Sequence, residues 1–216
     1  MHCPCGRSPS GSAPGTMSLY THVPGKPALI ELMIDTVAGQ VYSDIDEPSS
    51  RPGGWRAALA FIADRNWDLY LRHPWLLQVL GGRPVLGPRL SAEYEAELGP
   101  LDGIGLTDVE MDSVLTLVLV HVEGMARWQV SLQQIRDRSG QPDMDWWTSV
   151  EPALAAVMDL SGFPLSSRVG KAAGDYHQSA GDPTHVLEFG LHRILDGVQV
   201  LIDRADRAPG KPTVAP

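Results

Sequence analysis

The segment with the clearest chemical potential lies close to the N-terminus. It combines an apolar side, Leu19 and Val23, with side chains that can donate hydrogen bonds, namely Ser18, Tyr20, Thr21, His22 and Lys26. Small or planar donors can read base edges in a DNA groove, whereas a tyrosine hydroxyl and a lysine ammonium suit backbone phosphates. A short helix here would pack through its apolar side and present the donors outward, an arrangement that is compatible with contact to DNA. A surface turn before a helix is the alternative interpretation.

Patterns for catalysis or metal binding are weak in the rest of the chain. His121 and Glu123 are two residues apart, a spacing that places them on different faces of a helix. Lys171 is followed by Ala172 instead of Ser or Thr, so this segment does not match a phosphate-binding loop. The remaining candidate metal ligands are His2, Cys3 and Cys5. These are three residues, whereas a structural zinc site needs four ligands. The sequence therefore predicts no enzyme, no metal and no cofactor.

Charge is distributed unevenly along the 216 residues, whose formal net charge is −9. No Asp or Glu precedes Glu31, and the acidic excess follows that point. A non-acidic head on an acidic body fits a protein in which only the head meets phosphates. The longest apolar run, residues 114–122, is too short for a membrane span of roughly 20 residues. We expect no membrane partner and, from two cysteines that cannot staple a core, a reducing cytoplasmic setting.

Hydrophobic periodicity predicts an all-α protein, because apolar residues recur at helical spacing and no segment alternates with a period of two. Clusters of Pro, Gly and Ser break the pattern at residues 46–54, 138–142 and 161–164, and a long loop is expected to continue to Pro183. Thr107 and Glu110 have the spacing of a capping box that starts the longest helix. The expected helices are one after Pro27, then 55–73, 75–80, 90–98, 107–136, 146–160, and a last one from Asp182 or Thr184 to Arg204.

Two of these helices, residues 107–136 and the last one, are apolar over most of their circumference. Such a helix must be covered on most sides, and in a chain of this length a second subunit can supply the cover. Glycines inside both helices cost about 1 kcal/mol each relative to alanine, a cost that close helix approach would offset. Room for core side chains is the alternative role. We predict a homodimer whose interface is formed by Val118, Gly124, Leu187, Gly190, Ile194, Gly197 and Leu201.

The N-terminal segment also carries a family resemblance. SLYTHVPGK (residues 18–26), followed by ALIELMID (residues 28–35), resembles the end of the helix-turn-helix of TetR-family regulators and the helix that connects head and body. The resemblance covers residues 17–205 and includes the helix at 55–73, LGGRP at 80–84, the helix from Thr107 with Gly124, and EFGL at 188–191 before Gly197. It implies a ligand-responsive regulator, by family habit a repressor, that binds operator DNA as a dimer with a four-helix-bundle interface and is released by a small-molecule effector.

The N-terminal residues depart from the family pattern, in which two further helices precede the recognition helix. Residues 1–16 are rich in Pro, Gly and Ser and are expected to be disordered. One hypothesis is a shifted reading frame, because degenerate codons allow residues 6–15 to encode AVAERLGAG, which fits a second helix and turn. The expected organisation is 1–16 disordered or mis-framed, 17–42 as the end of the head and connecting helix, 54–205 as the ligand-binding and dimerisation domain, and 206–216 as a flexible tail.

The resemblance implies an effector pocket in the core of the body, at Tyr42, Ile62, Asn66, Val79 and Arg83. Val79 stands where the tetracycline repressor has a histidine that binds drug-held magnesium. Because valine cannot ligate a metal, a metal–tetracycline complex is not the expected effector. Arg83 would pair with a ligand acid or Glu123, or would cap a helix end.

An apolar, aromatic part of the pocket, suited to a flat lipophilic effector, could be lined by Trp67, Trp75, His121, Met125 and Trp128. Core packing is the alternative role for each of these side chains. Two rival functions also stay open. One is a dimeric small-molecule-binding module without DNA binding, and the other is a dimerisation partner that forms inactive heterodimers.

Overall fold

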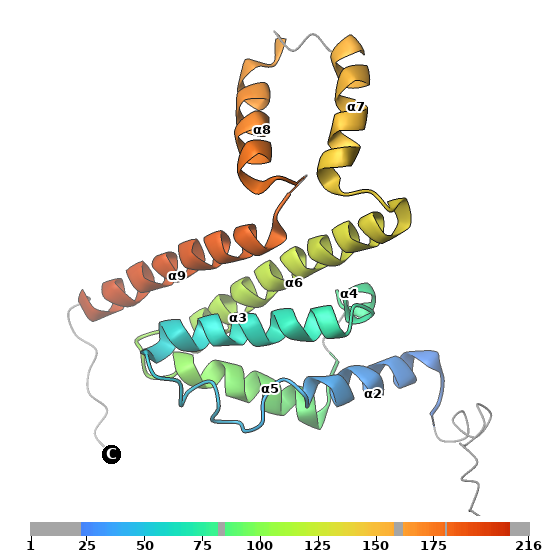
Figure 1. The fold of residues 1–216 in the computed structure, drawn as a ribbon. Helices are drawn as coiled ribbons and strands as arrows, with labels where there is room; N and C mark the ends of the chain where they lie inside the picture. Colours follow the sequence, from blue (N-terminus) through green and yellow to red (C-terminus); the bar gives the residue numbers. More distant parts are fainter. Residues whose placement is uncertain (1–22, 82–84, 158–161, 180, 208–216) are drawn as a thin grey trace, which may run out of the picture.

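A computed structural model describes residues 23–81, 85–157, 162–179 and 181–207 of the chain. These residues form helices joined by turns and loops, and they include no strand, which confirms the predicted all-α fold (Figure 1). No helix among them is long and apolar enough to cross a membrane.

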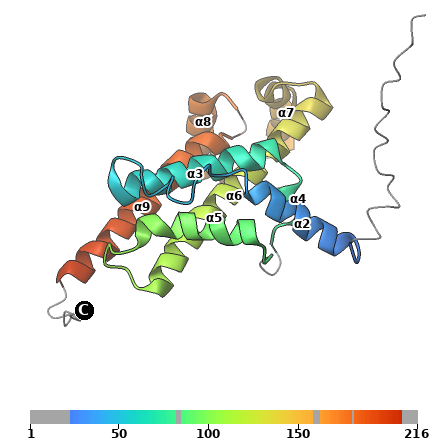
Figure 2. The ribbon, with the colours of Figure 1, turned by 90° about the horizontal axis from the view of Figure 1, so that it is seen from below.

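The helices form two layers that share α6. In the first layer α6 (Asp108–Ser139) packs against α9 (Pro183–Arg207) on one side and α3 (Gly54–Arg72) on the other. In the second layer α2 (Lys26–Ala38) and α5 (Pro88–Leu98) lie nearly end to end, and α5 also contacts α6. Figure 2 shows this second layer from below, with α2 extending outward from the body. The short α4 (Leu76–Val79) and the 3-10 turn η1 (Gly99–Leu101) connect these helices.

The hydrophobic core lies where α3, α6 and α9 meet. Leu59 and Ile62 of α3 and Leu115, Val118 and Val122 of α6 are completely buried there. Burial of each such side chain contributes about 1.5–3 kcal/mol relative to exposure. The buried side of α9 follows a spacing of three or four residues and consists of Leu187, Leu191, Leu195, Val198 and Ile202. This part of the core therefore holds α6 rigidly between its two neighbours.

The start of α6 has the predicted capping box. Thr107 donates its backbone N–H to Glu110 Oε2 at 2.8 Å, and Thr107 Oγ1 accepts the backbone N–H of Glu110 at 3.4 Å. The helix continues for 32 residues, about 48 Å, and ends at Ser139, before the C-cap residue Gly140, whose φ of 64° is left-handed. The helix therefore begins where the sequence predicted and ends three residues later than predicted.

The segment between α6 and α9 differs from the prediction. The predicted helix at 146–160 is present as α7 (Asp143–Val157), which begins three residues earlier than predicted. Instead of the long loop to Pro183, however, the chain forms a further helix, α8 (Pro164–His177), and the two helices rise together as an arm in Figure 1. The prediction of a loop was wrong because Gly170 and Gly174, which are typical of loops, interrupt an amphipathic helical pattern. That pattern consists of Leu165, Val169, Ala173 and Tyr176. Neither arm helix buries a described side chain, so the body does not depend on the arm for its core.

Candidate functional site

Three polar residues form a network between α3 and the second layer, which we name the pocket network: Tyr42, Asn66 and Glu97. Glu97 on α5 is only 3% exposed, and its Oε1 accepts hydrogen bonds from the Tyr42 hydroxyl at 2.8 Å and from Asn66 Nδ2 at 2.7 Å. Asn66 on α3 also donates to the carbonyl of Ile62 at 3.1 Å. The network thus joins α3, α5 and the loop after α2 through one buried carboxyl group.

Burial makes the carboxyl groups of this region weak acids. It raises the pKa of Glu97 to about 7, although the hydrogen bonds from Asn66 and Tyr42 act in the opposite direction. One turn earlier on α5, burial and then the charge of Glu97 raise the pKa of Glu93 to about 8. Burial and Glu97 also raise the pKa of the Tyr42 phenol. At pH 7 Glu93 is therefore mainly protonated and Glu97 is close to half ionised.

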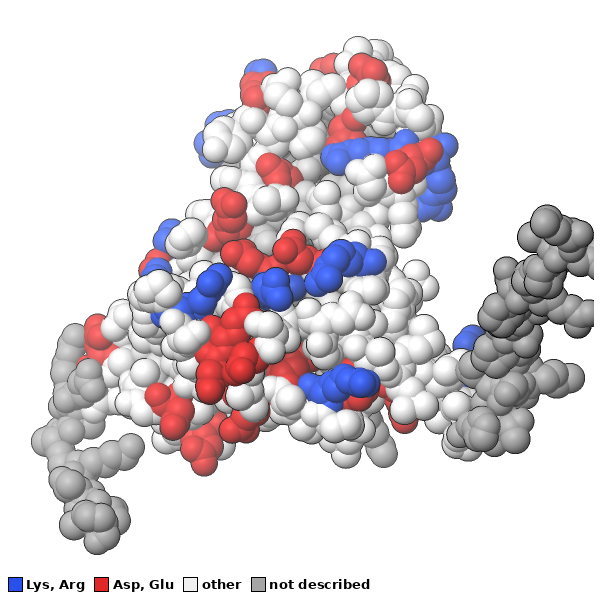
Figure 3. Space-filling model, turned by 60° about the horizontal axis from the view of Figure 1, so that its bottom comes forward, with Lys and Arg blue, Asp and Glu red and all other residues white. Residues whose placement is uncertain are grey.

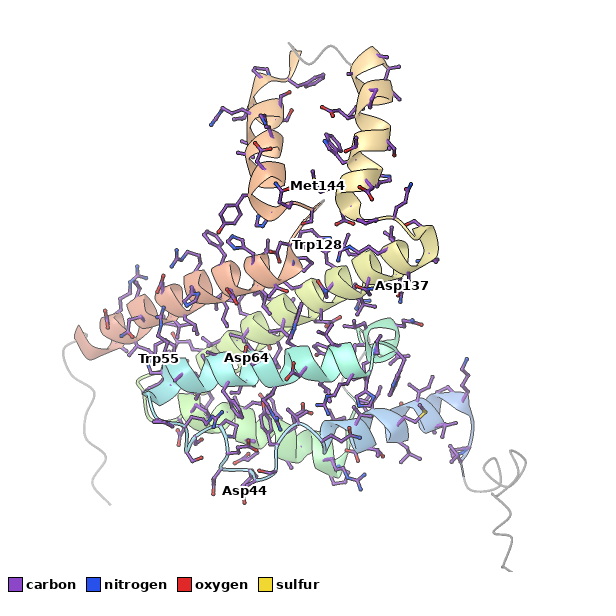
Figure 4. All side chains as sticks on the ribbon, in the orientation of Figure 1. Asp44, Trp55, Asp64, Trp128, Asp137 and Met144 are labelled. Atoms are coloured by element: carbon purple, nitrogen blue, oxygen red, sulfur yellow. The ribbon has the colours of Figure 1, made fainter. Side chains whose placement is uncertain are left out.

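A cleft of about 180 Å³ opens beside the pocket network, and we name it the α2–α5 cleft. One wall is formed by the end of α2 and the loop after it, and the other by one side of α5. Its lining residues are Ala38, Gly39, Tyr42, Ser43, Asp44, Ile45, Arg89, Ala92, Glu93 and Ala96. Figure 4 labels Asp44 at the outer edge of this region, in the loop below α3. The cleft therefore combines small apolar side chains with a phenol and a half-buried carboxyl group.

The structure places only some of the predicted pocket residues near this cleft. Tyr42 and Asn66 belong to the pocket network, and the completely buried Ile62 supports Asn66 through its carbonyl. Val79 lies exposed at the end of α4, and Arg83 lies outside the described residues. The alternative partner of Arg83 is already paired, because Glu123 Oε1 accepts a hydrogen bond from Arg127 Nη2 at 2.5 Å.

The aromatic part of the predicted pocket lies elsewhere, between α6 and α9. His121 Nε2 is 3.1 Å from the carbonyl oxygen of Leu187, and Met125 packs against the core. The ring of Trp128 lies against Gly181, where α6 meets the start of α9 (Figure 4). His121, Met125 and Trp128 therefore pack at the contact between α6 and α9 and do not belong to the pocket network.

Sequence reasoning missed Glu93 and Glu97, although a signal was present. Leu90, Glu93 and Glu97 are spaced at i, i+3 and i+7, so both carboxyl groups continue the inward stripe that Leu90 begins. Glutamates on a short helix usually face solvent, so neither residue was a candidate for the pocket. The depth of burial depends on how α5 packs against α2 and α3, which the spacing alone does not reveal.

The predicted interface residues divide into three groups. Val118 and Leu187 are buried in the subunit's own core, so they have no free surface to offer a partner, and this part of the prediction is corrected. Gly190 makes room for the His121 ring inside the subunit, which was the alternative role for a helical glycine. Gly124 and Gly197 are exposed with open space around them, while Ile194 and Leu201 are half-buried.

Exposed apolar side chains nevertheless occur on both α6 and α9, and we name this set the α6–α9 face. Its largest contributions come from Val120, which is 61% exposed, and Phe189, which is 58% exposed, together with Leu117 and Val200. Gly124 and Gly197 lie one helical turn or less from these side chains. The exposed positions adjacent to the buried ones, rather than Val118 and Leu187 themselves, are therefore available for contact.

Most predicted DNA-contacting residues cannot be placed: Ser18, Tyr20, Thr21 and His22 lie outside the described residues. Lys26 is the first residue of α2 and is exposed. On the face shown in Figure 3, the described Lys and Arg side chains are interrupted by Asp and Glu rather than gathered in a continuous stripe. This face of the body does not have the charge pattern of a nucleic-acid interface.

Comparisons with known proteins connect this geometry to regulators of transcription. A family model described as "Tetracyclin repressor-like, C-terminal domain" matches residues 47–202. The chain is 38% identical over 202 residues to the HTH-type transcriptional repressor DrrR1 of Streptomyces coeruleorubidus, which covers 90% of this chain and 70% of that protein. It is 26% identical over 204 residues to an HTH-type transcriptional repressor of Mycobacterium tuberculosis, which covers 93% and 74% respectively. The similarity therefore extends over nearly all of the chain.

Proposed function

Because the chain belongs to the tetracycline-repressor-like (TetR-like) family of transcription regulators, we propose that its body is the sensor of a repressor whose small-molecule effector occupies the α2–α5 cleft. The matching relatives are named repressors, and release of DNA on effector binding is the corresponding proposal for this chain. The observation that carries it is the pocket network beside the cleft.

The energetics of the pocket network support a binding role. A buried carboxyl group costs stability even when hydrogen-bonded, and an apolar side chain of similar size would serve packing better. Small-molecule sites, in contrast, keep a few convergent polar groups among apolar ones, and titratable groups with shifted pKa values gather there. Glu93 and Glu97, with pKa values raised to about 8 and 7, fit this description.

The cleft also suggests the chemistry of its effector. Glu93 lines the cleft and makes no hydrogen bond to the described residues, and the same lining includes Ala38, Ala92 and Ala96 as well as the polar Ser43, Asp44 and Arg89. A lipophilic molecule with a protonated amine would place its cation beside Glu93, where it would lower the raised pKa and favour the ionised carboxylate, and its apolar part against Ala92 and Ala96. Because about 180 Å³ is less than a drug-sized pocket, a larger effector would widen the cleft.

Thermal unfolding with small probes tests this proposal. We expect phenethylamine to raise the melting temperature, because a ligand of the native state stabilises it by about 2.7 kcal/mol at a hundred times its Kd. The neutral 3-phenylpropanol and the acidic 3-phenylpropanoate should have weaker effects. Glu93→Gln should remove the advantage of the amine, whereas Glu95→Gln, an exposed position on the same helix, should keep it. Equal shifts with all three probes would contradict recognition of an amine.

Dimerisation is the second part of the proposal, with the α6–α9 face as the interface. Its exposed apolar side chains and open glycines suit the same face of a second copy, as in a four-helix bundle. Val120→Glu should convert a dimer into a monomer in analytical ultracentrifugation, because two carboxylates would be buried close together. Gln78→Glu, on exposed α4, is the matched control and should leave the dimer intact. A dimer that survives Val120→Glu would move the interface elsewhere.

DNA contact is assigned to residues 18–26 as the sequence predicts, and the test is binding to the DNA that flanks the gene. Binding should weaken as salt rises, because phosphate contacts release counterions. A chain that binds the probes but no flanking DNA would favour the rival function of a dimeric small-molecule-binding module.

A further inference from the structure

A buried aspartate on α2 holds the first turn of α5. Asp35, whose side chain is 9% exposed, accepts hydrogen bonds through Oδ1 from the backbone N–H groups of Arg89 at 2.9 Å and Leu90 at 3.1 Å. Its Oδ2 is 3.7 Å from Arg89 Nη1. We name this set of contacts the Asp35 clamp. It connects two helices whose contacting residues are more than fifty positions apart in the chain.

The clamp replaces a local helix cap. The first N–H groups of a helix are normally satisfied by the side chain of the residue before it. In α5 that residue is Gly87, which has no side chain, and Asp35 bonds the second and third residues of the helix in its place. Gly87 has an extended φ of −152°, which any residue can adopt. Its importance is space, because a Cβ atom there would overlap the Asp35 carboxylate.

The clamp lies at one end of the α2–α5 cleft. Arg89 extends the contact by packing its side-chain stem over Gly39, directly after α2. The same two segments continue as the walls of the cleft, with Ala38 and Tyr42 on one side and Ala92 on the other. A molecule that enters the cleft and pushes on α5 must therefore have one of two effects. Either it breaks the hydrogen bonds of the Asp35 clamp, or α2 moves together with α5.

We propose that Asp35 is a positioning residue that transmits movement of α5 to α2, and so toward residues 18–26 that precede it. The proposal rests on the proposed function in one respect, namely that the cleft is where an effector acts. An intact clamp makes the end of α2 follow α5, because separation would leave two backbone N–H groups without their partner. The hydrogen bonds from Arg89 and Leu90 to Asp35 therefore both fix the distance between the two walls and couple a movement of α5 to α2.

The coupling can be tested without effector or DNA, by filling the cleft with a side chain. Ala92→Phe adds bulk to the cleft wall on α5, and Glu95→Phe is the matched control, since Glu95 is exposed on the same helix but does not line the cleft. Amide hydrogen exchange is then measured over α2 in full-length protein. The measurement is repeated in backgrounds that carry Asp35→Ala, Asp35→Asn or Gly87→Ala.

With Asp35 present, Ala92→Phe should change exchange over α2 by about fivefold, because a helix cap is worth about 1 kcal/mol and the coupling cannot exceed it. Asp35→Ala and Gly87→Ala should each reduce that change to less than about twofold, and Asp35→Asn, which keeps an acceptor oxygen, should retain most of it. If Asp35→Ala unfolds the second layer, the result with Gly87→Ala decides whether the clamp couples α5 to α2. An equal response of α2 in all backgrounds, or none with Asp35 present, would overturn the proposal. Failure of the amine probes to bind would leave this result unaffected, so the two proposals fail separately.

Discussion

Replacing Glu97 with glutamine should make the protein more stable at neutral and alkaline pH. The pKa of Glu97 is raised from 4.5 to about 7 in the folded protein, mainly by burial. The folded state therefore retains a proton that the unfolded state loses between pH 4.5 and 7, and stability falls as pH rises through this window. The difference between these two pKa values corresponds to about 3 kcal/mol of stability. Glutamine keeps a carbonyl oxygen for Tyr42 and Asn66 but has no proton to lose.

The assay is urea unfolding of both proteins between pH 4 and 8.5, with the free energy of unfolding compared at each pH. The two curves should nearly coincide at pH 4, where Glu97 is protonated in both states. They should then diverge, so that Glu97→Gln is about 3 kcal/mol more stable above pH 8. Glu95→Gln serves as the control and should run parallel to the parent protein. Parallel curves for Glu97→Gln as well would mean that the carboxyl is not buried as the structure describes it.

Three further predictions concern packing, capping and DNA contact. Gly190→Ala should cost about 1–3 kcal/mol in urea unfolding, because the added methyl overlaps the ring of His121, whereas Gly197→Ala meets no atom of the subunit and should be tolerated within it. Thr107→Ala should cost about 1 kcal/mol by removing half of the capping box of α6, measured as a lower midpoint of thermal unfolding, and an unchanged midpoint would contradict the role of the cap. Lys26→Ala should weaken DNA binding similarly across sequences and lower the salt slope by about 1, as read from titrations at several salt concentrations, and a sequence-selective loss would point to a base contact instead.

The sequence predicted those features of the fold that depend on local chemistry. The capping box at Thr107, the end of α3 before Pro74 and the amphipathic spacing of α9 are each determined by neighbouring residues, and the structure has all three. The arm helix α8 was not predicted, because glycines such as Gly170 and Gly174 are more typical of a loop than of a helix. Local patterns therefore located the helices of the body but not the one whose apolar stripe is interrupted by glycine.

The candidate site was harder to predict because its properties arise from contacts between helices. Tyr42 and Asn66 came from the family resemblance, but the carboxyl that joins them is Glu97, a residue type that usually faces water. Trp128 and His121, which sequence reasoning placed in the pocket, instead fill the space between α6 and α9. Whether a side chain lines a cavity or a helix contact depends on which helix packs on it, and residue spacing does not contain that information.

The buried polar groups are concentrated where α3 meets the second layer of the body. Among the described residues, the buried polar or charged side chains are Asp35, Asn66 and Glu97, and all three connect α2, α3 and α5. The buried side chains of α6 and α9 are, in contrast, entirely apolar. Apolar packing is stable whatever the pH or ligand, whereas a buried carboxyl responds to both. This contrast favours a division of roles, in which the packing of α6 against α9 stays fixed and the second layer, with α2 and α5, responds to the effector. A double substitution that removes both carboxyl groups, Glu93→Leu with Glu97→Leu, should then abolish the response to amines in thermal unfolding, and a melting temperature that still rises with phenethylamine would contradict this division.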